Sequence, residues 1–183
     1  MVAAVNAANS GSCADFGLFR SVDGGATFAQ LGAAQGLPAG LSTALVSHAS
    51  APATLFAHVD GAERCGGLAS ANGIFRSIDN GATWTRVGSA AMNSLLAVTG
   101  KLVRMQAIAG GNVVAAISDA RLQGVFASAD SGDNWTLLGF PQTFEGEQAI
   151  GIHPGGQGRL HLSVAIDPSN PNLVFVGGDR QPV

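Results

Sequence analysis

The sequence predicts an all-β protein built from repeated four-stranded antiparallel sheets, and three observations support this fold class. First, nearly the same twelve residues occur three times, as GLFRSVDGGATF, GIFRSIDNGATW and GVFASADSGDNW. Second, the acidic position of this repeat recurs at Asp23, Asp79 and Asp130, 56 and 51 residues apart. Third, the chain is 46% hydrophobic and holds 26 glycines, as expected of short strands joined by many turns. A period of this length is typical of the blades of a β-propeller.

Each copy of the repeat is predicted to form a β-hairpin, because an apolar run ends at Ser-x-Asp-x-Gly and another short strand follows. The Asp carboxylate and the Ser hydroxyl can accept hydrogen bonds from backbone N–H groups of the turn, and the glycine can adopt a positive φ. The aromatic residue that begins the return strand is expected to pack between neighbouring sheets. These residues are Ser21, Asp23, Gly25 and Phe28, then Ser77, Asp79, Gly81 and Trp84, then Ser128, Asp130, Gly132 and Trp135.

A serine beside an aspartate also fits a nucleophile and an acid of an active site. Catalysis needs one such arrangement, whereas a structural turn is needed in every sheet. The threefold occurrence therefore favours a structural role, and we assign no catalytic function to these three carboxylates.

The motif resembles the Asp-box, which is also called the bacterial neuraminidase repeat. Residues 77–84, SIDNGATW, match the pattern Ser-x-Asp-x-Gly-x-Thr-Trp at every defining position, while Phe28 replaces the Trp of the first copy and Asn134 the Thr of the third. The resemblance covers almost the whole chain with its flanking strands and implies a β-propeller. It implies less about function, because similar repeats occur in sialidases, xyloglucan-cleaving hydrolases, sortilin-type receptors and photosystem assembly factors.

Strand patterns around the boxes divide the chain into blade segments at residues 1–31, 42–88, 101–139 and 161–177. With the strands of a blade lettered A to D, the two central segments carry all four, the first carries B, C and D, and the last carries A and B. We expect a single partial propeller over residues 1–183, completed by further blades of a longer parent chain or by a second copy. The ragged start and end favour the longer chain.

Composition excludes several classes of function. The net charge is −3 and Lys101 is the only lysine, so a nucleic-acid surface is not expected. No apolar run approaches the roughly 20 residues of a membrane-spanning helix. The N-terminus lacks the basic and apolar regions of a secretory signal, although the resemblance implies an extracellular or periplasmic parent protein. Helix has little room in the Ala-rich stretches, which Gly, Pro and Asn interrupt.

The two cysteines, Cys13 and Cys65, both fall in connections between strands B and C of adjacent blades. A disulfide between blades would suit an exported protein, and two free thiols are the alternative. No Cys/His spacing of the zinc type and no calcium-binding motif is present, so we predict neither a metal nor a cofactor.

Candidate ligand-binding residues lie in the long B–C and D–A loops, which share one face of a propeller. Residues 60–65 and 144–161 form the longest of these loops, and residues 179–181 begin another. One interpretation is a sugar cleft, since glycoside hydrolysis usually uses two carboxyl groups. The other interpretation is a solvated loop whose charges keep the protein soluble. The candidates are Glu145 or Glu147 as an acid or base, Arg64, Arg159 and Arg180 for carboxylates or hydroxyls, and His153 and His161 for hydrogen bonds.

A complete sialidase site is not expected. The resemblance implies a tyrosine nucleophile and three arginines, and this sequence contains no tyrosine. The expected function is carbohydrate binding or hydrolysis, by part of an exported glycoside-hydrolase-like protein. The alternative is a non-catalytic propeller that scaffolds protein–protein interaction or assembly. This alternative fits the small number of loop aromatics that could stack on a sugar, which are Phe140 and Phe144.

Overall fold

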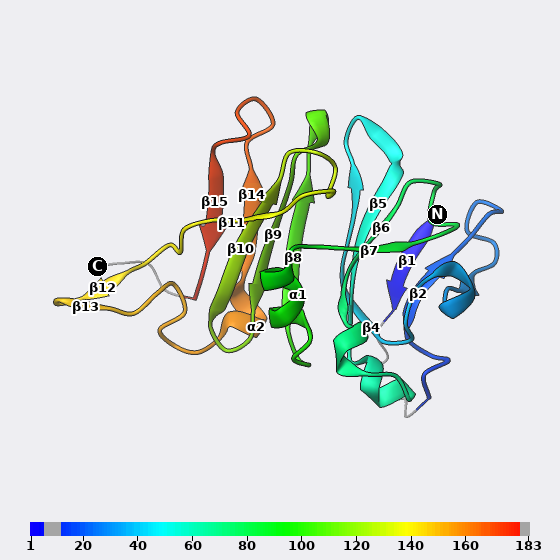
Figure 1. Cartoon of the computed structure of the whole chain (residues 1–183), viewed down its shortest axis with the longest axis horizontal. Helices are drawn as coiled ribbons and strands as arrows, with labels where there is room; N and C mark the ends of the chain where they lie inside the picture. Colours follow the sequence, from blue (N-terminus) through cyan, green and yellow to red (C-terminus); the bar gives the residue numbers. More distant parts are fainter. Residues whose placement is uncertain (6–11, 180–183) are drawn as a thin grey trace. The chain divides into compact units, whose positions relative to one another are not determined.

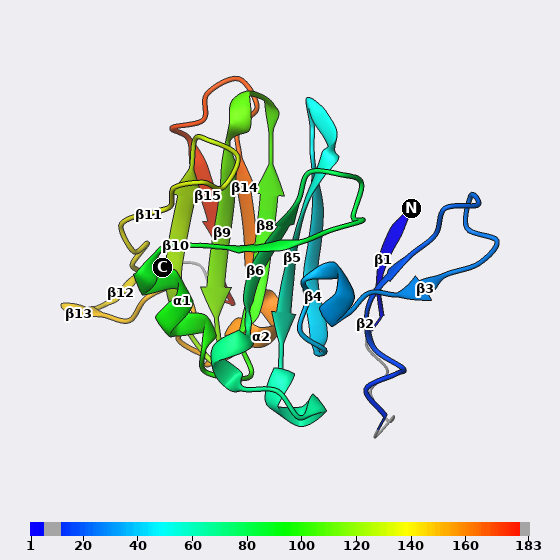
Figure 2. The ribbon, with the colours of Figure 1, turned by 45° about the vertical axis from the view of Figure 1, so that its right-hand side comes forward.

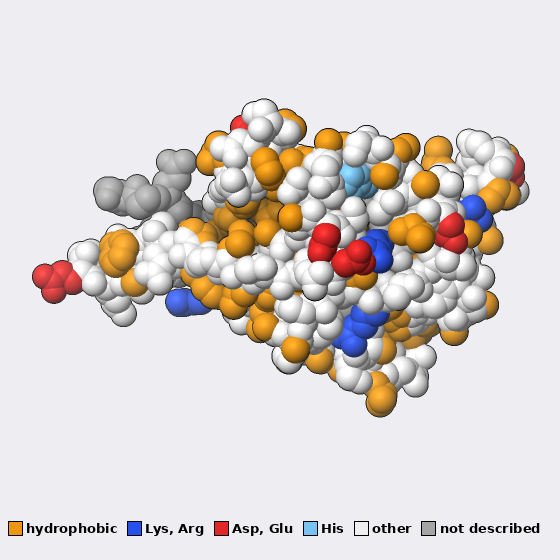
Figure 3. All heavy atoms as spheres, turned by 45° about the horizontal axis from the view of Figure 1, so that its top comes forward, with side chains coloured by type: hydrophobic (Ala, Val, Ile, Leu, Met, Phe, Trp, Pro, Cys, Tyr) orange, Lys and Arg blue, Asp and Glu red, His pale blue; other side chains and the backbone are white. Residues whose placement is uncertain are grey.

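The structure, a computed structural model, describes residues 1–5 and 12–179. The chain forms two compact units, Met1–Thr99 and Gly100–Val183. Antiparallel β-sheets dominate both units (Figure 1). On the face drawn in Figure 3, apolar side chains in orange are widespread and charged side chains are few, in keeping with the 11% of charged residues.

The first unit holds a three-stranded and a four-stranded sheet. The three-stranded sheet has the order β1-β2-β3, with β1 at Val2–Val5, β2 at Gly17–Arg20 and β3 at Ala29–Gln30. The four-stranded sheet has the order β4-β5-β6-β7, with β4 at Leu41–His48, β5 at Ala51–Asp60, β6 at Gly73–Ser77 and β7 at Thr85–Val87. Strands β1 and β2 lie beside β4 (Figure 2). The short helical segments are η1 (Ala33–Gln35), η2 (Ala62–Cys65), η3 (Ala69–Ala71) and α1 (Ala90–Leu96).

The second unit contains another four-stranded sheet, in the order β11-β10-β9-β8. Its strands are β8 (Leu102–Ala107), β9 (Val113–Ser118), β10 (Leu122–Ser128) and β11 (Thr136–Leu137). Strand β14 (Ser163–Ile166) packs across β8 and β9 and pairs with β15 (Val174–Gly177). A separate hairpin joins β12 (Phe144–Glu145) to β13 (Gln148–Ala149), and the helical segments are η4 (Ala109–Gly111) and α2 (Gly158–His161).

The sheets of three, four and four strands and the β14–β15 pair lie where the sequence pattern predicted strands. The two-stranded β12–β13 hairpin was not predicted and lies in a segment expected to be a loop. The sequence analysis expected little helix and did not predict α1. Ser89 begins this helix by accepting a hydrogen bond from the Met92 N–H at 3.3 Å, a typical N-cap contact. Met92 and Leu96, four residues apart on one side of the helix, are fully buried. Because seven residues are too few for a helix that is stable on its own, this packing holds the segment in place.

The core of the first unit lies between its two sheets. Leu18 and Leu31, in and after the three-stranded sheet, pack against residues of the β4–β7 sheet. These are Ala57 of β5, Phe75 of β6 and Trp84 of the turn between β6 and β7. Leu37, Val59 and the partly buried Val2, Leu45 and Leu55 complete this cluster. The second unit repeats the arrangement, with Val114 and Val125 on one sheet and Ile166 on the other.

Cys13 and Cys65 form a disulfide, which settles the question that the sequence left open. The bond joins the connection between β1 and β2 to the end of η2, between β5 and β6. It therefore links the two sheets of the first unit covalently. In the part of the chain that the structure describes, no helix is both long and apolar enough to span a bilayer.

Candidate functional site

The three Ser-x-Asp-x-Gly turns, called box turns below, carry the same hydrogen-bond network. In the second turn, the Ser77 hydroxyl accepts from the Gly81 N–H at 2.8 Å and donates to Asp79 Oδ1 at 2.7 Å. Asp79 Oδ1 also accepts from the Thr83 N–H at 2.9 Å, and Oδ2 accepts from the Thr83 hydroxyl at 2.6 Å. Gly81 has a φ of 78°, which a residue with a side chain rarely adopts.

The first and third turns reproduce each of these contacts. Asp23 is bound by Ser21 and Thr27, and Asp130 by Ser128 and Asn134. The Asn134 amide donates to Asp130 Oδ2 at 2.7 Å and so replaces the missing threonine hydroxyl. Gly25 and Gly132 also have positive φ.

These hydrogen bonds keep the box carboxylates ionised. The Thr83 hydroxyl, followed by the Thr83 N–H, lowers the pKa of Asp79 to about 2. The N–H of Asn134, followed by its side-chain amide, lowers the pKa of Asp130 to about 2. The pKa of Asp23 is lowered in the same way, chiefly by the Thr27 hydroxyl. The carboxylates thus act as turn acceptors, as the sequence predicted from their repetition.

The aromatic residues of the three boxes differ in how far they are buried. Trp84 and Trp135 are 4% and 7% exposed, and their indole N–H groups donate to the carbonyls of Gly81 at 3.2 Å and Gly132 at 3.0 Å. Phe28 is 44% exposed. The prediction that this residue packs between sheets is therefore wrong for Phe28, although it holds for Trp84, which belongs to the core of the first unit.

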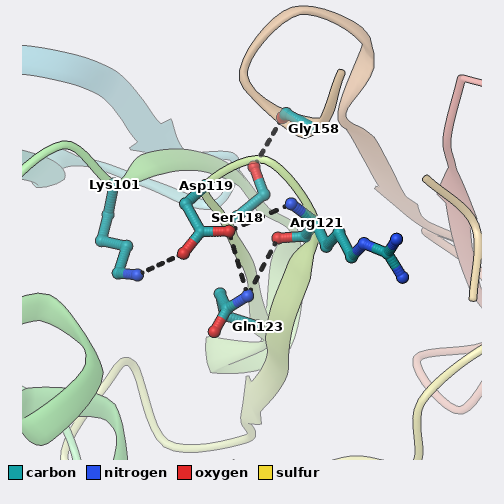
Figure 4. Close-up of polar contacts among 6 residues, drawn as sticks. All are labelled: Lys101, Ser118, Asp119, Arg121, Gln123 and Gly158. Carbon is teal, nitrogen blue, oxygen red and sulfur yellow. Dashed lines mark hydrogen bonds and ion pairs between the residues drawn. The ribbon is translucent and has the colours of Figure 1, made fainter. Parts of the chain in front are cut away.

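A charged cluster around Asp119 lies at the end of the four-stranded sheet of the second unit (Figure 4). Lys101, just before β8, donates to Asp119 Oδ2 at 2.7 Å. Oδ1 of Asp119 accepts from the Arg121 N–H at 3.0 Å and from the Gln123 amide at 3.1 Å. The Arg121 side chain points away from the carboxylate (Figure 4).

Helix α2 is fixed against this cluster by hydrogen bonds to the backbone of Gly158. The Ser118 hydroxyl donates to the Gly158 carbonyl at 2.6 Å, and the Gly158 N–H donates to the Ala120 carbonyl at 2.9 Å. A Cβ on Gly158 would lie 2.7 Å from the carbonyl oxygen of Asp119, so only glycine fits this approach. The contact places the next residue of α2, Arg159, near the cluster.

Asp119 is ionised although it is partly buried. Burial alone raises the pKa of this carboxyl, but the hydrogen bonds from Arg121 and Lys101, with the charges of Lys101 and Arg159, outweigh burial and lower it. A Cβ on Gly100 would lie 2.9 Å from Nη2 of Arg159, which places the guanidinium beside Gly100. Lys101 is buried, whereas Arg121 and Arg159 are exposed. The cluster thus presents an anionic acceptor and the exposed guanidinium of Arg159.

A second polar centre surrounds Asp179. Its carboxylate accepts from the backbone N–H groups of Gly155 at 3.4 Å and Gln157 at 2.9 Å. The nearby His153 is 1% exposed, and neither ring nitrogen has a hydrogen-bond partner within the described ranges. Burial lowers the pKa of His153, the charge of Asp179 opposes this, and His161 adds to the lowering. His153 is therefore a neutral buried ring.

Some of the predicted site residues fall together and others do not. His153, Arg159 and His161 share the segment that leads into and through α2. Glu145 belongs to β12, and Glu147 lies exposed in the turn of the β12–β13 hairpin. Arg64 is exposed in η2 of the first unit, and Arg180 lies outside the described residues.

Sequence reasoning missed Lys101, Asp119 and Gln123. A signal was present, because an aspartate stands at or just after the end of the second strand of three sheets, as Asp60, Asp119 and Asp179. Alignment of the repeats by strands, and not only by boxes, would have marked this position.

No group of three His, Cys, Asp or Glu side chains within residues 1–5 and 12–179 is arranged to hold a metal ion. No protein-family model matches the sequence, and no curated protein matches it significantly.

Proposed function

We propose that this chain is an Asp-box β-propeller segment of an exported protein and that it binds carbohydrate through the cluster around Asp119. Three features support the propeller: the threefold box network, the two four-stranded antiparallel sheets and the sheet-to-sheet core that holds Trp84. The disulfide between Cys13 and Cys65 supports an oxidising compartment.

The observation that carries the binding function is the composition of the Asp119 cluster. A carbohydrate presents many hydroxyl groups, each of which can donate and accept hydrogen bonds. Asp119 supplies acceptor oxygens, Gln123 supplies an amide, and the exposed Arg159 supplies donors in a fixed planar geometry. The hydrogen bonds to Lys101 and the Arg121 N–H hold the carboxylate in place before a ligand arrives.

The same contacts favour binding over hydrolysis. A general acid in glycoside cleavage must be protonated near neutral pH, which requires a raised pKa. The pKa of Asp119 is lowered, and the box carboxylates are engaged by their own turns. The ionised Asp119 is suited to accept hydrogen bonds from sugar hydroxyls rather than to donate a proton.

The test is binding of the full chain to a panel of neutral and acidic oligosaccharides, followed by titration calorimetry with any that bind. Arg159→Ala should weaken binding at least about tenfold without a change in melting temperature, because the guanidinium is exposed. Arg64→Ala is the matched control, since this arginine is exposed in the first unit. Absence of binding across the panel, or equal affinity of the Arg159 variant, would contradict the proposal.

Protein scaffolding is the second candidate, and it is supported by large apolar side chains on the surface. Phe140, Phe144 and Phe175 are each about half exposed, at 47%, 56% and 55%. Exposed aromatic residues of this size are common in protein interfaces. If the oligosaccharide panel is blank while Phe144→Ser abolishes capture of a defined partner protein, scaffolding replaces carbohydrate binding.

A further inference from the structure

A groove of about 270 Å³ opens in the second unit beside β15. Val125 of β10, with Leu138 and Gly139 after β11, forms one wall, and Val174 and Val176 of β15 form another. In the part of the chain that the structure describes, β15 pairs on one side only, with β14. Figure 3 shows apolar side chains gathered in a hollow in the left half of the face drawn.

The first wall of the groove corresponds to the surface that receives Trp84 in the first unit. Val125 follows the first glycine of its repeat as Leu18 does, and Leu138 stands three residues after the box aromatic as Leu31 does. Leu18 and Leu31 both belong to the cluster that encloses Trp84. This wall of the groove is therefore built from the same repeat positions as the wall against which Trp84 packs in the first unit.

The second wall corresponds as well. Val176 pairs with Val164 of β14 as Ala57 pairs with Leu45 of β4. Val174 also corresponds to Leu55 of the first unit. Each lies five residues before the aspartate that recurs near the end of the second strand, Asp179 and Asp60. In the first unit the core between these walls is completed by Phe75 and Trp84.

One box aromatic of this chain has no such enclosure. Phe28 is 44% exposed on the β2–β3 hairpin, and Phe19 of β2 stands at the repeat position of Phe75. The hairpin thus offers, in the same order and spacing, the two aromatic positions that complete the core of the first unit.

We propose that the groove is an interface for a second copy of this chain, whose β2–β3 hairpin inserts Phe28 as Trp84 is inserted in the first unit. The contact continues an interface that the molecule already forms between its own sheets. Phe19 of the second copy then lies opposite Val176, because Phe75 pairs with Ala57.

This docking implies an exchange of strands. In the separate chain, β1 pairs with β2 through Val2 opposite Arg20 and Ala3 opposite Phe19. In the docked pair, Arg20 and Phe19 of one copy lie opposite Phe175 and Val176 of β15 of the other copy. Strands β1 and β15 have four residues each and compete for the same edge of β2. Association is therefore a strand swap, which is a common route to dimers.

The test is the mass of the full chain, with its disulfide intact, by sedimentation and light scattering over a wide concentration range. The wild type should associate as concentration rises. Phe28→Ser should raise the dissociation constant at least about tenfold, because buried aromatic anchors dominate interfaces. Leu68→Ser, which changes an exposed apolar residue outside both the groove and the β2–β3 hairpin, is the control and should associate like the wild type.

Two further variants address the groove and the fit. No atom lies within 4 Å of a Cβ built on Gly139, so Gly139→Trp can fill the groove from within and should prevent association. Phe28→Trp should strengthen association, because its indole N–H can donate to the Gly25 carbonyl as Trp84 does to Gly81. A cooperative melting transition of each variant would show that it is folded.

A mixture tests the head-to-tail geometry. The Phe28→Ser copy keeps its groove and the Gly139→Trp copy keeps its hairpin, so the two should form a heterodimer when mixed although neither associates alone. A wild type that stays monomeric at every concentration overturns the proposal. So does association that neither variant weakens, or a mixture that forms no heterodimer.

Discussion

The clearest test of the core is to remove the box aromatic in two repeats and compare the losses of stability. Trp84 is 4% exposed, packs between the two sheets of the first unit and donates to the Gly81 carbonyl. Truncation of a buried tryptophan to alanine costs about 3–5 kcal/mol, from lost transfer free energy and the cavity left behind. Trp84→Ala should therefore lower the free energy of unfolding of the first unit by about this amount.

Phe28→Ala should cost much less, although the two residues occupy the same position of their repeats. Complete burial of a phenylalanine contributes about 1.5–3 kcal/mol, and Phe28, which is 44% exposed, should contribute roughly half of this. The expected cost is about 1 kcal/mol. Sequence alone would predict similar costs for the two variants.

The assay is urea unfolding, with free energies from linear extrapolation. The chain has two tryptophans, so Trp84→Ala leaves Trp135 as the only one, and fluorescence then follows the second unit. Far-ultraviolet circular dichroism follows both units. A cost for Phe28→Ala that equals the cost for Trp84→Ala would refute the assignment of Trp84 to an enclosed core and of Phe28 to the surface.

Three more outcomes are expected. Reduction of the Cys13–Cys65 bond, which spans 52 residues, should lower the free energy of unfolding by about 4 kcal/mol, measured by urea unfolding with and without reductant. Burial lowers the pKa of His58 from 6.5 to about 3, so the unfolded chain binds more protons in this range, and the melting temperature should fall as pH drops below 6.5. His58→Gln should flatten that fall. Hydrogen bonds lower the pKa of Asp79 and Asp130 from 3.8 to about 2, so their stabilisation is complete above pH 3.8 and is lost toward pH 2. Asp79→Asn and Asp130→Asn should each reduce this acid-dependent loss in melting curves, because each removes one such carboxylate.

The sequence predicted the sheets and box turns well because both depend on local patterns. Alternating apolar runs and turn residues identified the strands, and the Ser-x-Asp-x-Gly spacing predicted the hydrogen bonds seen at Asp79. Helix α1 was missed because its seven residues are too few to show a sustained 3.6-residue period, although Ser89 as N-cap and the spacing of Met92 and Leu96 are local signals.

The candidate site was harder to predict, because its residues come from separate segments. Lys101 and Asp119 are 18 residues apart, and Gly158 reaches them from the far side of a long connection. No local pattern joins these positions. The exposure of Phe28 was likewise hidden, since it depends on which sheet lies beside the hairpin and not on the box sequence.

The disulfide also sets how the first unit responds to a pulling force. Because Cys13 and Cys65 are bonded, tension applied at the two ends of the chain passes through the bond and bypasses the residues between them. Strands β2 to β5 lie inside this closed loop and carry no load, whereas β1 lies outside it and can be peeled away. The 52-residue separation corresponds to about 180 Å of extended chain that stays hidden from force until a reductant opens the loop.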